Sequence, residues 1–410
     1  MNSLEYIYSK NRGDYQRDNF DEFLRKIKFS FSRPAIHIAG TNGKGSVAHF
    51  LHDIYMANGY KVGLFTSPDD PLEMSKICGK CIEISYIDKK IDEYRKLIDK
   101  YDLSTFEIQV FITLSWFNDN NVDIAVIECG MGGEYDATNI FTPVLSIITS
   151  IDFEHAEFLG ASLSEIALHK AGIIKEEVPA LIGNIEGDAL TVIVDKSKRE
   201  SAKLVVVDRY HNLHKEEGYS IFDYRPYHDL KIPSLASYRV YNAGLAIEAT
   251  NILMDSFPVQ EDKLKEGLAS STLKCRFEVV NKTPLIMLDG AHNPEGMISL
   301  RKEIDLNYGG KGLNIKVVFA SFRDKNISLM LPEISLIGEV TLTTFENGRA
   351  RDDSDYFLYL DDYKYNGDYK ALIDSLISEA EENTMILVTG SLTFTYVVRN
   401  YLKEKGLLNA

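Results

Sequence analysis

The sequence predicts an α/β fold in two domains: a larger one built on a parallel-rich sheet and a smaller, Rossmann-like one at the C-terminal end. An apolar run at residues 36–39 leads into a glycine-rich turn and then into a helical pattern. Further near-continuous apolar runs, of the kind that parallel sheets bury, occupy residues 122–127 and 144–151. Beyond residue 285 strands and helices alternate, which predicts a second α/β unit.

Length and charge exclude several classes of protein. The chain has 410 residues, enough for two or three domains with substantial cores. A net charge of −16 argues against a nucleic-acid binder, which would present a basic face. No apolar run has the length of a membrane span, and the first residues lack the basic-then-apolar order of a signal peptide. We therefore expect a cytoplasmic protein that binds neither nucleic acid nor membranes.

The cysteines predict neither a disulfide framework nor a metal site. Four cysteines are too few for a disulfide framework in a chain of this length. Cys78 and Cys81 have the spacing of zinc or redox sites, but no second Cys or His pair lies nearby to complete a tetrahedral zinc site. A hairpin around a Gly-Lys turn is favoured there, and Cys129 and Cys275 are expected to fill the core.

Residues 36–46 (IHIAGTNGKGS) are predicted to bind phosphate. Backbone N–H groups of the glycine-rich turn, and the N-terminus of the helix that follows, would surround phosphate oxygens. Lys44 would add a positive charge and Ser46 a hydroxyl ligand for magnesium. The general P-loop pattern is not matched strictly, since its first glycine would fall on Ile38 and Gly45 separates the lysine from the serine. A purely structural glycine turn is the alternative.

Periodicity predicts most of the other elements. Apolar residues at helical spacing predict helices over residues 46–57 and 105–117, and Ser162 begins a capping box. Residues 201–238 are expected to form a β-rich surface excursion, after which a helix opens at Tyr241. The remaining predicted strands cover residues 61–65, 285–288, 316–320 and 385–389, and the remaining helices cover residues 1–34 in part, 295–304 and 372–381. Three histidines of the excursion have spacings that match no metal motif: His211, His214 and His228.

Three polar side chains follow predicted strands, and one of them, Glu128, is a candidate magnesium ligand. Glu128 ends the strand of residues 122–127 beside glycines, at the edge where open α/β sheets bind ligands. Magnesium prefers hard oxygen ligands and keeps several waters, so one carboxylate with hydroxyl and phosphate oxygens suffices. Ser67 and His155 follow two other strands. Taken alone, they indicate a turn serine and a histidine satisfied by ordinary contacts.

Several of these segments together resemble the folylpolyglutamate synthase and dihydrofolate synthase family of the Mur ligase superfamily. The motifs that carry the resemblance occur in the family's order and are GTNGKGS (40–46), ECGMGG with DATN (128–139), DFEHAEFLG (152–160), KAGIIK (170–175) and DGAHNP (289–294). The resemblance implies a Mur-ligase-like ATP-binding domain with a folate-binding loop over residues 1–280. It also implies a C-terminal domain of the glutamate-ligase type over residues 281–410.

The resemblance implies roles for individual residues. Nucleotide contacts would come from Asn42, Gly43, Lys44, Gly45, Ser46, Asn242, Arg276, Asp289 and His292, of which Asn242 would contact the adenine and Arg276 the phosphates. Substrate contacts would come from Asp136, Ala137 and Thr138, and two magnesium ions would be held by Ser46, Ser67, Glu128 and His155. Catalysis would depend on Lys44, His155 and Lys170. In many relatives the lysine at Lys170 is carbamylated, which would give a carboxylate-like metal ligand; a surface lysine at a helix end is the alternative.

The resemblance further implies that the chain forms amide bonds at the expense of ATP. A carboxylate would accept the γ-phosphoryl group, and an incoming amine would attack the resulting acyl phosphate. The acid would be dihydropteroate, a reduced folate or both, and the amine would be L-glutamate. ATP and Mg²⁺ are the expected cofactors, and a monomer is expected.

Some segments depart from the family pattern and leave alternatives open. A Mur-type ligase acting on a different acid is one. A simple P-loop NTPase or kinase would not account for residues 170–175 and 289–294, and an inactive ATP-binding regulator would not account for the filled metal-ligand positions. The departures are two aspartates and a proline within residues 69–77 (the family's folate-contacting loop), Glu134 in place of a basic residue, Glu154 in place of an aspartate, and residues 236–239 in place of Gly-x-His-Gln.

Overall fold

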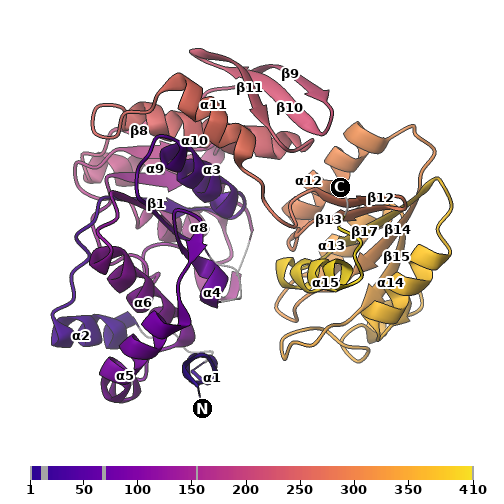
Figure 1. The fold of residues 1–410 in the computed structure, drawn as a ribbon, viewed down its shortest axis with the longest axis horizontal. Coiled ribbons are helices and arrows are strands. Elements are labelled where there is room, and N and C mark those ends of the chain that lie inside the picture. The colour runs from indigo at the N-terminus through magenta and orange to yellow at the C-terminus, as the bar shows by residue number, and fades with distance from the viewer. Residues whose placement is uncertain (1, 11–16, 67–70, 154–155, 409–410) are drawn as a thin grey trace. The chain divides into compact units, whose positions relative to one another are not determined.

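The computed structural model describes residues 2–10, 17–66, 71–153 and 156–408. The chain forms two compact units (Figure 1). Unit 1 comprises Met1–His214, Ile221–Ile232 and Arg239–Ser271, and unit 2 comprises Lys215–Ser220, Pro233–Tyr238 and Thr272–Ala410. Residues 215–220, 233–238 and 272–280, which the sequence-based division assigned to the first domain, thus belong to unit 2.

An eight-stranded sheet forms the centre of unit 1, in the order β4-β3-β2-β5-β1-β6-β7-β8. The strands from β2 to β8 in this order run parallel, while β3 and β4 are antiparallel additions at one edge. Since β1 lies between β5 and β6, the segments that follow these three strands meet at the carboxyl edge of the sheet. The strands are β1 (Ala35–Ala39), β2 (Val62–Phe65), β3 (Ser75–Ile77), β4 (Lys80–Cys81), β5 (Ile124–Glu128), β6 (Leu145–Ile148), β7 (Ala180–Ile182) and β8 (Leu204–Val206).

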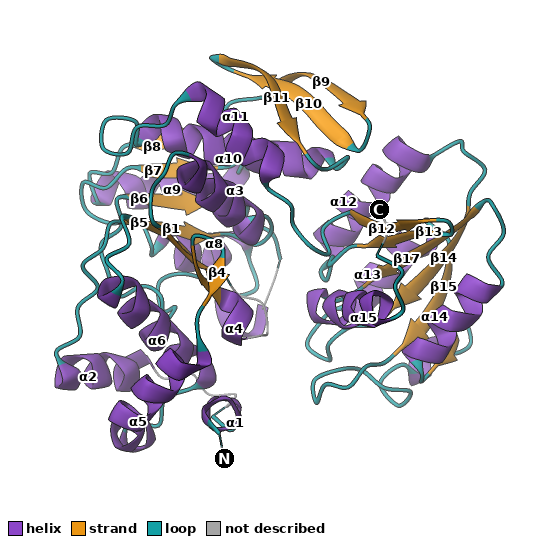
Figure 2. Cartoon of the chain, viewed as in Figure 1, coloured by secondary structure: helices purple, strands orange, loops and turns teal. Residues whose placement is uncertain are grey.

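Helices cover both faces of this sheet (Figure 2). Alternate residues of β1 enter different cores, because successive side chains of a strand point to opposite faces: Ile36 and Ile38 pack with α3, α10 and α11, whereas Ala35 packs with α2, α5 and α6. The helices of unit 1 are α1 (Ser3–Tyr8), α2 (Arg17–Ile27), α3 (Lys44–Ala57), α4 (Pro71–Met74), α5 (Ile84–Lys100), α6 (Thr105–Asp119), α7 (Ala156–Leu159), α8 (Leu163–Ala171), α9 (Gly187–Arg199), α10 (Ser237–Ile252) and α11 (Glu261–Ser270). The predicted β-rich excursion is confirmed as a three-stranded sheet of β9 (His211–Glu216), β10 (Tyr219–Tyr224) and β11 (Tyr227–Ile232).

Unit 2 is built on a six-stranded sheet in the order β12-β13-β17-β14-β15-β16, which is parallel except for β12. Helices α12 and α13 share one apolar core with the sheet, and α14 and α15 share the other. The expected Rossmann-like domain is therefore confirmed. Its elements are β12 (Glu278–Lys282), β13 (Leu285–Leu288), α12 (Pro294–Tyr308), β14 (Asn314–Phe319), α13 (Ile327–Ser335), β15 (Glu339–Thr343), the 3₁₀ helix η1 (Phe357–Tyr359), β16 (Lys364–Asn366), α14 (Tyr369–Ser378), β17 (Thr384–Thr389) and α15 (Leu392–Glu404).

Several local predictions are confirmed and others need correction. The capping box at Ser162 begins α8, and both core cysteines are fully buried. The CxxC segment forms the β3–β4 hairpin, but Cys78 and Gly79 make its turn, with φ of 48° and 76°. The helix expected to open at Tyr241 begins at Ser237, because buried Arg239 and Val240 extend its packed face. Among the described residues, no helix is long and apolar enough to cross a membrane.

Gly267 lies where α11 packs against α3. A Cβ at this position would lie 2.5 Å from Cα of Ile54 and 2.7 Å from its backbone nitrogen. We expect Gly267→Ala to lower the free energy of unfolding by about 3 kcal/mol, because a methyl group forced into a tight backbone contact displaces a helix. Denaturant titration measures this change. Gly348→Ala is the control, since a Cβ there meets nothing within 4 Å, and equal effects of the two substitutions would contradict the prediction.

Candidate active site

The glycine-rich loop connects β1 to α3, as the sequence predicts. Gly43 caps the helix with φ of 92°, a conformation that favours glycine, and α3 begins at Lys44 rather than at Ser46. The Lys44 ammonium donates hydrogen bonds to the backbone oxygens of Gly40 (2.9 Å) and Thr41 (3.2 Å). The positive charge therefore lies across the loop that is predicted to hold phosphate.

Residues that follow β6 brace this loop. The Thr149 hydroxyl donates to the backbone oxygen of Asn42 (2.6 Å), and the Asn42 N–H donates to the Ser150 hydroxyl (2.9 Å). The Thr41 hydroxyl donates to the backbone oxygen of Asp152 (3.2 Å). The segment after β6 thus holds the loop in shape, so less conformational entropy would be lost when a ligand binds.

Glu128 ends β5 and its carboxylate lies against the start of α3. The side chain is only 7% exposed, and a Cβ at Gly45 would lie 3.3 Å from its Oε2 atom. Glycine at position 45 therefore leaves room for the carboxylate one residue before the Ser46 hydroxyl. Carboxylate and hydroxyl oxygens are the donors that magnesium prefers, so these residues fit the expected ion.

The remaining predicted metal ligands, Ser67 and His155, lie outside the described residues. Within the described part of the chain, no group of three or more His, Cys, Asp and Glu side chains is arranged to hold a metal ion. The predicted set therefore depends on Glu128 and the hydroxyl of Ser46, together with phosphate oxygens.

Asn242, the predicted adenine contact, reaches the loop from α10. Its side chain is 6% exposed, and its Oδ1 atom lies 2.6 Å from where a Cβ on Gly43 would be. The turn of α10 that carries it is therefore packed on the segment that is predicted to bind phosphate. About 200 residues separate the two segments in the sequence. They meet because α3 and α10 pack in the same core.

Lys170 is fully buried near the end of α8, at 1% exposure. The alternative of a surface lysine is therefore wrong. A Cβ at Gly133 would lie 2.9 Å from the backbone oxygen of Lys170, so α8 packs directly on the glycine-rich segment that follows Glu128. A lysine buried to this extent needs a polar or charged partner. Its carbamylation, which would replace the positive charge with an oxygen anion, stays a prediction.

The predicted substrate residues form a buried turn. Asp136 accepts hydrogen bonds from the N–H groups of Met131 (2.8 Å) and Thr138 (2.9 Å), and burial raises the pKa of this carboxyl. Ala137 and Thr138 are buried as well. The polar atoms of Asp136 and Thr138 hold the turn in shape, and direct contact of these residues with a substrate stays a prediction.

Arg17 was not predicted as a site residue, yet it fastens this turn to α2. Its guanidinium donates to the backbone oxygens of Asp136 and, at 3.0 Å, of Asn139. The partners are 119 and 122 residues away in the sequence. No local pattern around Arg17 could have indicated this contact.

His37 is a second residue that the prediction missed. It is fully buried in β1, with its Nε2 atom 2.8 Å from the Thr138 hydroxyl and 3.1 Å from the Cys129 sulfur. The Thr138 hydroxyl donates to Asp136, so the ring nitrogen must donate to Thr138, which fixes the Nε2–H tautomer. A histidine inside the apolar run of residues 36–39 was the available signal.

The unfolding free energy should depend on the protonation of His37. Burial, with a smaller contribution from the Lys175 charge, lowers its pKa to about 3. The unfolded chain, with a pKa near 6.5, takes up the proton first, so stability is lost as the pH falls below about 6.5. Between about pH 7 and about pH 5 we expect wild-type to lose about 2 kcal/mol more than His37→Gln, measured by urea titration. Equal losses in the two proteins would contradict this.

In unit 2, Asp289 organises the segment around β13. The side chain is 4% exposed. Its carboxylate accepts hydrogen bonds from the N–H groups of Phe277 (2.8 Å) and Ala291 (2.9 Å) and from the Tyr238 hydroxyl (2.9 Å). The predicted nucleotide contact of Asp289 stays a prediction, while its contacts within unit 2 give it a structural role.

Gly290 provides a shared acceptor for two other predicted site residues. Its backbone oxygen accepts hydrogen bonds from His292 Nδ1 (2.8 Å) and from the guanidinium of Arg276 (3.2 Å). Because a carbonyl can only accept, the Nδ1 atom of His292 carries the proton. Both side chains are therefore gathered at the carboxyl end of β13.

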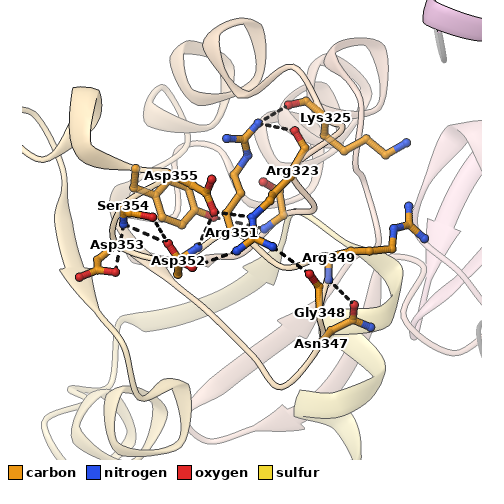
Figure 3. Close-up of polar contacts among 12 residues, drawn as sticks. Arg323, Lys325, Asn347, Gly348, Arg349, Arg351, Asp352, Asp353, Ser354 and Asp355 are labelled. Atoms are coloured by element: carbon orange, nitrogen blue, oxygen red, sulfur yellow. Dashed lines mark hydrogen bonds and ion pairs between the residues drawn. The ribbon is translucent and has the colours of Figure 1, made fainter. Parts of the chain in front are cut away.

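Basic side chains also gather after β14, but aspartates balance them (Figure 3). Arg323 pairs with Asp352 (2.9 Å) and Asp355 (2.7 Å). Arg351 donates to the backbone oxygens of Arg323 (2.8 Å) and Lys325 (3.0 Å). These contacts tie the segment after β15 to the segment after β14.

Comparison with known proteins identifies the class of protein. The model of the Mur ligase middle domain matches residues 38–250, and that of the Mur ligase, glutamate ligase domain matches residues 275–392. The chain belongs to the Mur ligase family, as its motifs indicated.

Individual relatives specify the branch. Folylpolyglutamate synthase of Lacticaseibacillus casei is 28% identical over 90% of this chain and 89% of its own length. Dihydrofolate synthetase of Saccharomyces cerevisiae is 30% identical over 76% of this chain and 77% of its own. The structure of Mycobacterium tuberculosis folylpolyglutamate synthase complexed with ADP and AMPPCP superposes with a TM-score of 0.86 at 26% identity, covering 97% of this chain and 98% of that one. Within the Mur ligases, the chain is thus a member of the folylpolyglutamate synthase and dihydrofolate synthase family.

Proposed function

We propose that this protein is an ATP-dependent ligase that adds L-glutamate to dihydropteroate, to reduced folates or to both. The observation that carries the proposal is the position of the Glu128 carboxylate against Gly45, which lies between Lys44 and Ser46 in the sequence. This position would bring a hard-metal ligand to a phosphate-binding loop in unit 1. The relatives that match nearly the whole chain carry folate-ligase names, which supports the choice of substrates.

The nucleotide would be held by the loop between β1 and α3. The backbone N–H groups of the loop and the Lys44 ammonium would bind the phosphates, and Asn242 would contact the adenine. Glu128 and Ser46 would hold magnesium, which would neutralise phosphate charge when bound. Ser67 and His155 are proposed as further metal ligands, and Arg276, Asp289 and His292 as further nucleotide contacts.

The reaction would proceed in two transfers. An oxygen of the acid's carboxylate attacks the γ-phosphorus of ATP, and the bond to ADP breaks. The glutamate nitrogen then attacks the carbonyl carbon of the acyl phosphate, phosphate leaves, and the nitrogen loses a proton. Lys44 would contribute by stabilising the charge that develops during the first transfer.

The test is a phosphate-release assay with ATP, Mg²⁺ and L-glutamate, with dihydropteroate and tetrahydrofolate supplied separately and products examined by mass spectrometry. A product heavier by one glutamyl residue on either acid would support the proposal and name the substrate. Intact ATP binding with no turnover of either acid would contradict it. That outcome would favour a Mur-type ligase for another acid, the alternative raised by the departures within residues 69–77.

Carbamylation of Lys170 is a separate part of the proposal. The buried position near Gly133 supports it, because a carbamate anion would give the metal site an oxygen ligand. With ¹³C-labelled bicarbonate, we expect a carbamate resonance in the NMR spectrum of the wild-type protein and none in that of Lys170→Arg. Equal spectra would contradict the modification. The expected monomeric state and cytoplasmic location also stay predictions.

A further inference from the structure

Arg276 lies between two residues with an unfavourable backbone conformation. Cys275 has φ of 57° and Phe277 has φ of 52°, which is the left-handed region that residues with a side chain rarely adopt. Such residues persist only where the surrounding structure over-determines them, and they cluster at functional positions. The contacts that hold these two residues should therefore be visible in the structure.

Glu278 holds the first of them. Its Oε2 atom accepts a hydrogen bond from the Cys275 N–H at 2.6 Å. Arg399, from α15, grips the same carboxylate: its Nε atom lies 3.0 Å from Oε1 and 3.1 Å from Oε2, and a terminal nitrogen lies 2.9 Å from Oε1. Both side chains are about four-fifths buried, so the pair is shielded from most of the solvent. A forked guanidinium–carboxylate pair of this kind fixes direction as well as distance.

The other side of Arg276 is held by the β13 segment. Asp289 accepts the Phe277 N–H at 2.8 Å, and the Gly290 N–H donates to the backbone oxygen of Cys275 at 2.8 Å. Each of the two left-handed residues thus has its N–H bound by a carboxylate. Asp289 is already among the predicted site residues, whereas Glu278 and Arg399 have been given no role.

We propose that Glu278 and Arg399 are positioning residues, which impose the strained backbone at Cys275 and Phe277 and thereby direct the Arg276 guanidinium. The inference rests on the proposed function in one respect, namely that Arg276 binds nucleotide phosphate. Without the pair, the Cys275 backbone would relax toward an ordinary conformation. Arg276 would then sample several directions, and the nucleotide would have to select one of them at a cost in affinity and rate.

A double-mutant cycle on the full-length chain tests this. We expect Arg276→Ala to lower kcat/KM for ATP by about tenfold or more, and Glu278→Ala to lower it by a comparable factor. If Glu278 acts through Arg276, the double variant should lie within about twofold of Arg276→Ala alone, because coupled residues are not additive. The Kd for ADP, measured by calorimetry, gives the same cycle a readout that does not depend on the acid substrate.

The controls separate positioning from general stability. Glu333→Ala breaks another Arg–Glu pair of unit 2, in which Arg301 Nε lies 2.9 Å from Glu333, and it should leave kcat/KM unchanged. Arg399→Lys keeps the charge but loses the fork, so it should show part of the effect of Glu278→Ala. It takes the place of Glu278→Ala in the cycle if circular dichroism shows that the latter does not fold.

The outcomes separate the positioning role of Glu278 from the proposed ligase function. If Arg276→Ala lowers kcat/KM and the double variant loses as much as the product of the two single losses, the positioning role is wrong. The proposed function would be unaffected by that result. Wild-type kinetics and ADP affinity for Arg276→Ala would overturn the phosphate role of Arg276 and this inference with it. Failure of the wild-type chain to ligate any acid would refute the proposed function, while the cycle in ADP affinity would still decide whether Glu278 acts through Arg276.

Discussion

Lys44→Ala is expected to lower kcat/KM for ATP by about 10² to 10³-fold, because it removes the one full positive charge of the loop between β1 and α3. In the structure the ammonium is held across the loop by the backbone oxygens of Gly40 and Thr41. A triphosphate attracts the ammonium more strongly than these neutral carbonyl groups do. The Lys44 side chain can therefore exchange its hydrogen bonds for the phosphate oxygens without a large rearrangement. Phosphate release with the preferred acid and L-glutamate measures the loss.

A matched control is Lys61→Ala. Lys61 donates to the backbone oxygen of Asn120 at 2.6 Å on the surface of the same unit, so its loss removes an equal charge away from the loop. Its kcat/KM should stay within about twofold of wild-type, since surface substitutions of this kind act weakly. A Lys44→Ala variant that keeps its fold and most of its activity would exclude a phosphate-binding role for the loop.

The parts of the fold that the sequence predicted are those that depend on short segments. An apolar run followed by a glycine-rich turn has few folded solutions, so β1, the loop and α3 were predicted within two residues. Glu128 was placed correctly for the same reason: it ends a buried strand beside glycines. The resemblance then supplied the order of motifs, which periodicity alone does not specify.

What the sequence did not predict depends on contacts between distant segments. His37 meets Thr138 101 residues away, and Arg17 reaches Asn139 across 122 residues. Such pairs depend on the tertiary arrangement, in which β1 lies between β5 and β6, and local sequence patterns do not determine strand order. The enclosure of Lys170 also depends on tertiary packing, because a lysine near a helix end is ordinarily exposed and here α8 packs on Gly133. Its predicted role at the metal site came from the resemblance and not from a local pattern.

Glu128→Gln is the second substitution expected to have a large effect. Glutamine keeps the size and one carbonyl oxygen of the side chain but loses the negative charge that a divalent cation requires. We expect kcat/KM for ATP to fall by about 10² to 10³-fold and the half-saturating Mg²⁺ concentration to rise by about tenfold or more. Because Glu128 packs against Gly45, the variant should retain the shape of the loop. Kinetics at a series of Mg²⁺ concentrations measure both changes.

Glu107→Gln provides the comparison that makes this result specific. Glu107 is also a buried carboxylate of unit 1, at 2% exposure, but it accepts the Ser104 N–H at 2.7 Å and caps α6. Its neutralisation should change the free energy of unfolding and leave the Mg²⁺ dependence unaltered, since a cap acts on the helix alone. If both variants raised the half-saturating Mg²⁺ concentration equally, the effect would result from the loss of any buried negative charge and not from the loss of a metal ligand. A shift confined to Glu128→Gln would identify the carboxylate beside Gly45 as a metal ligand. The metal, and the phosphates bound to it, would then lie on the Glu128 side of the loop.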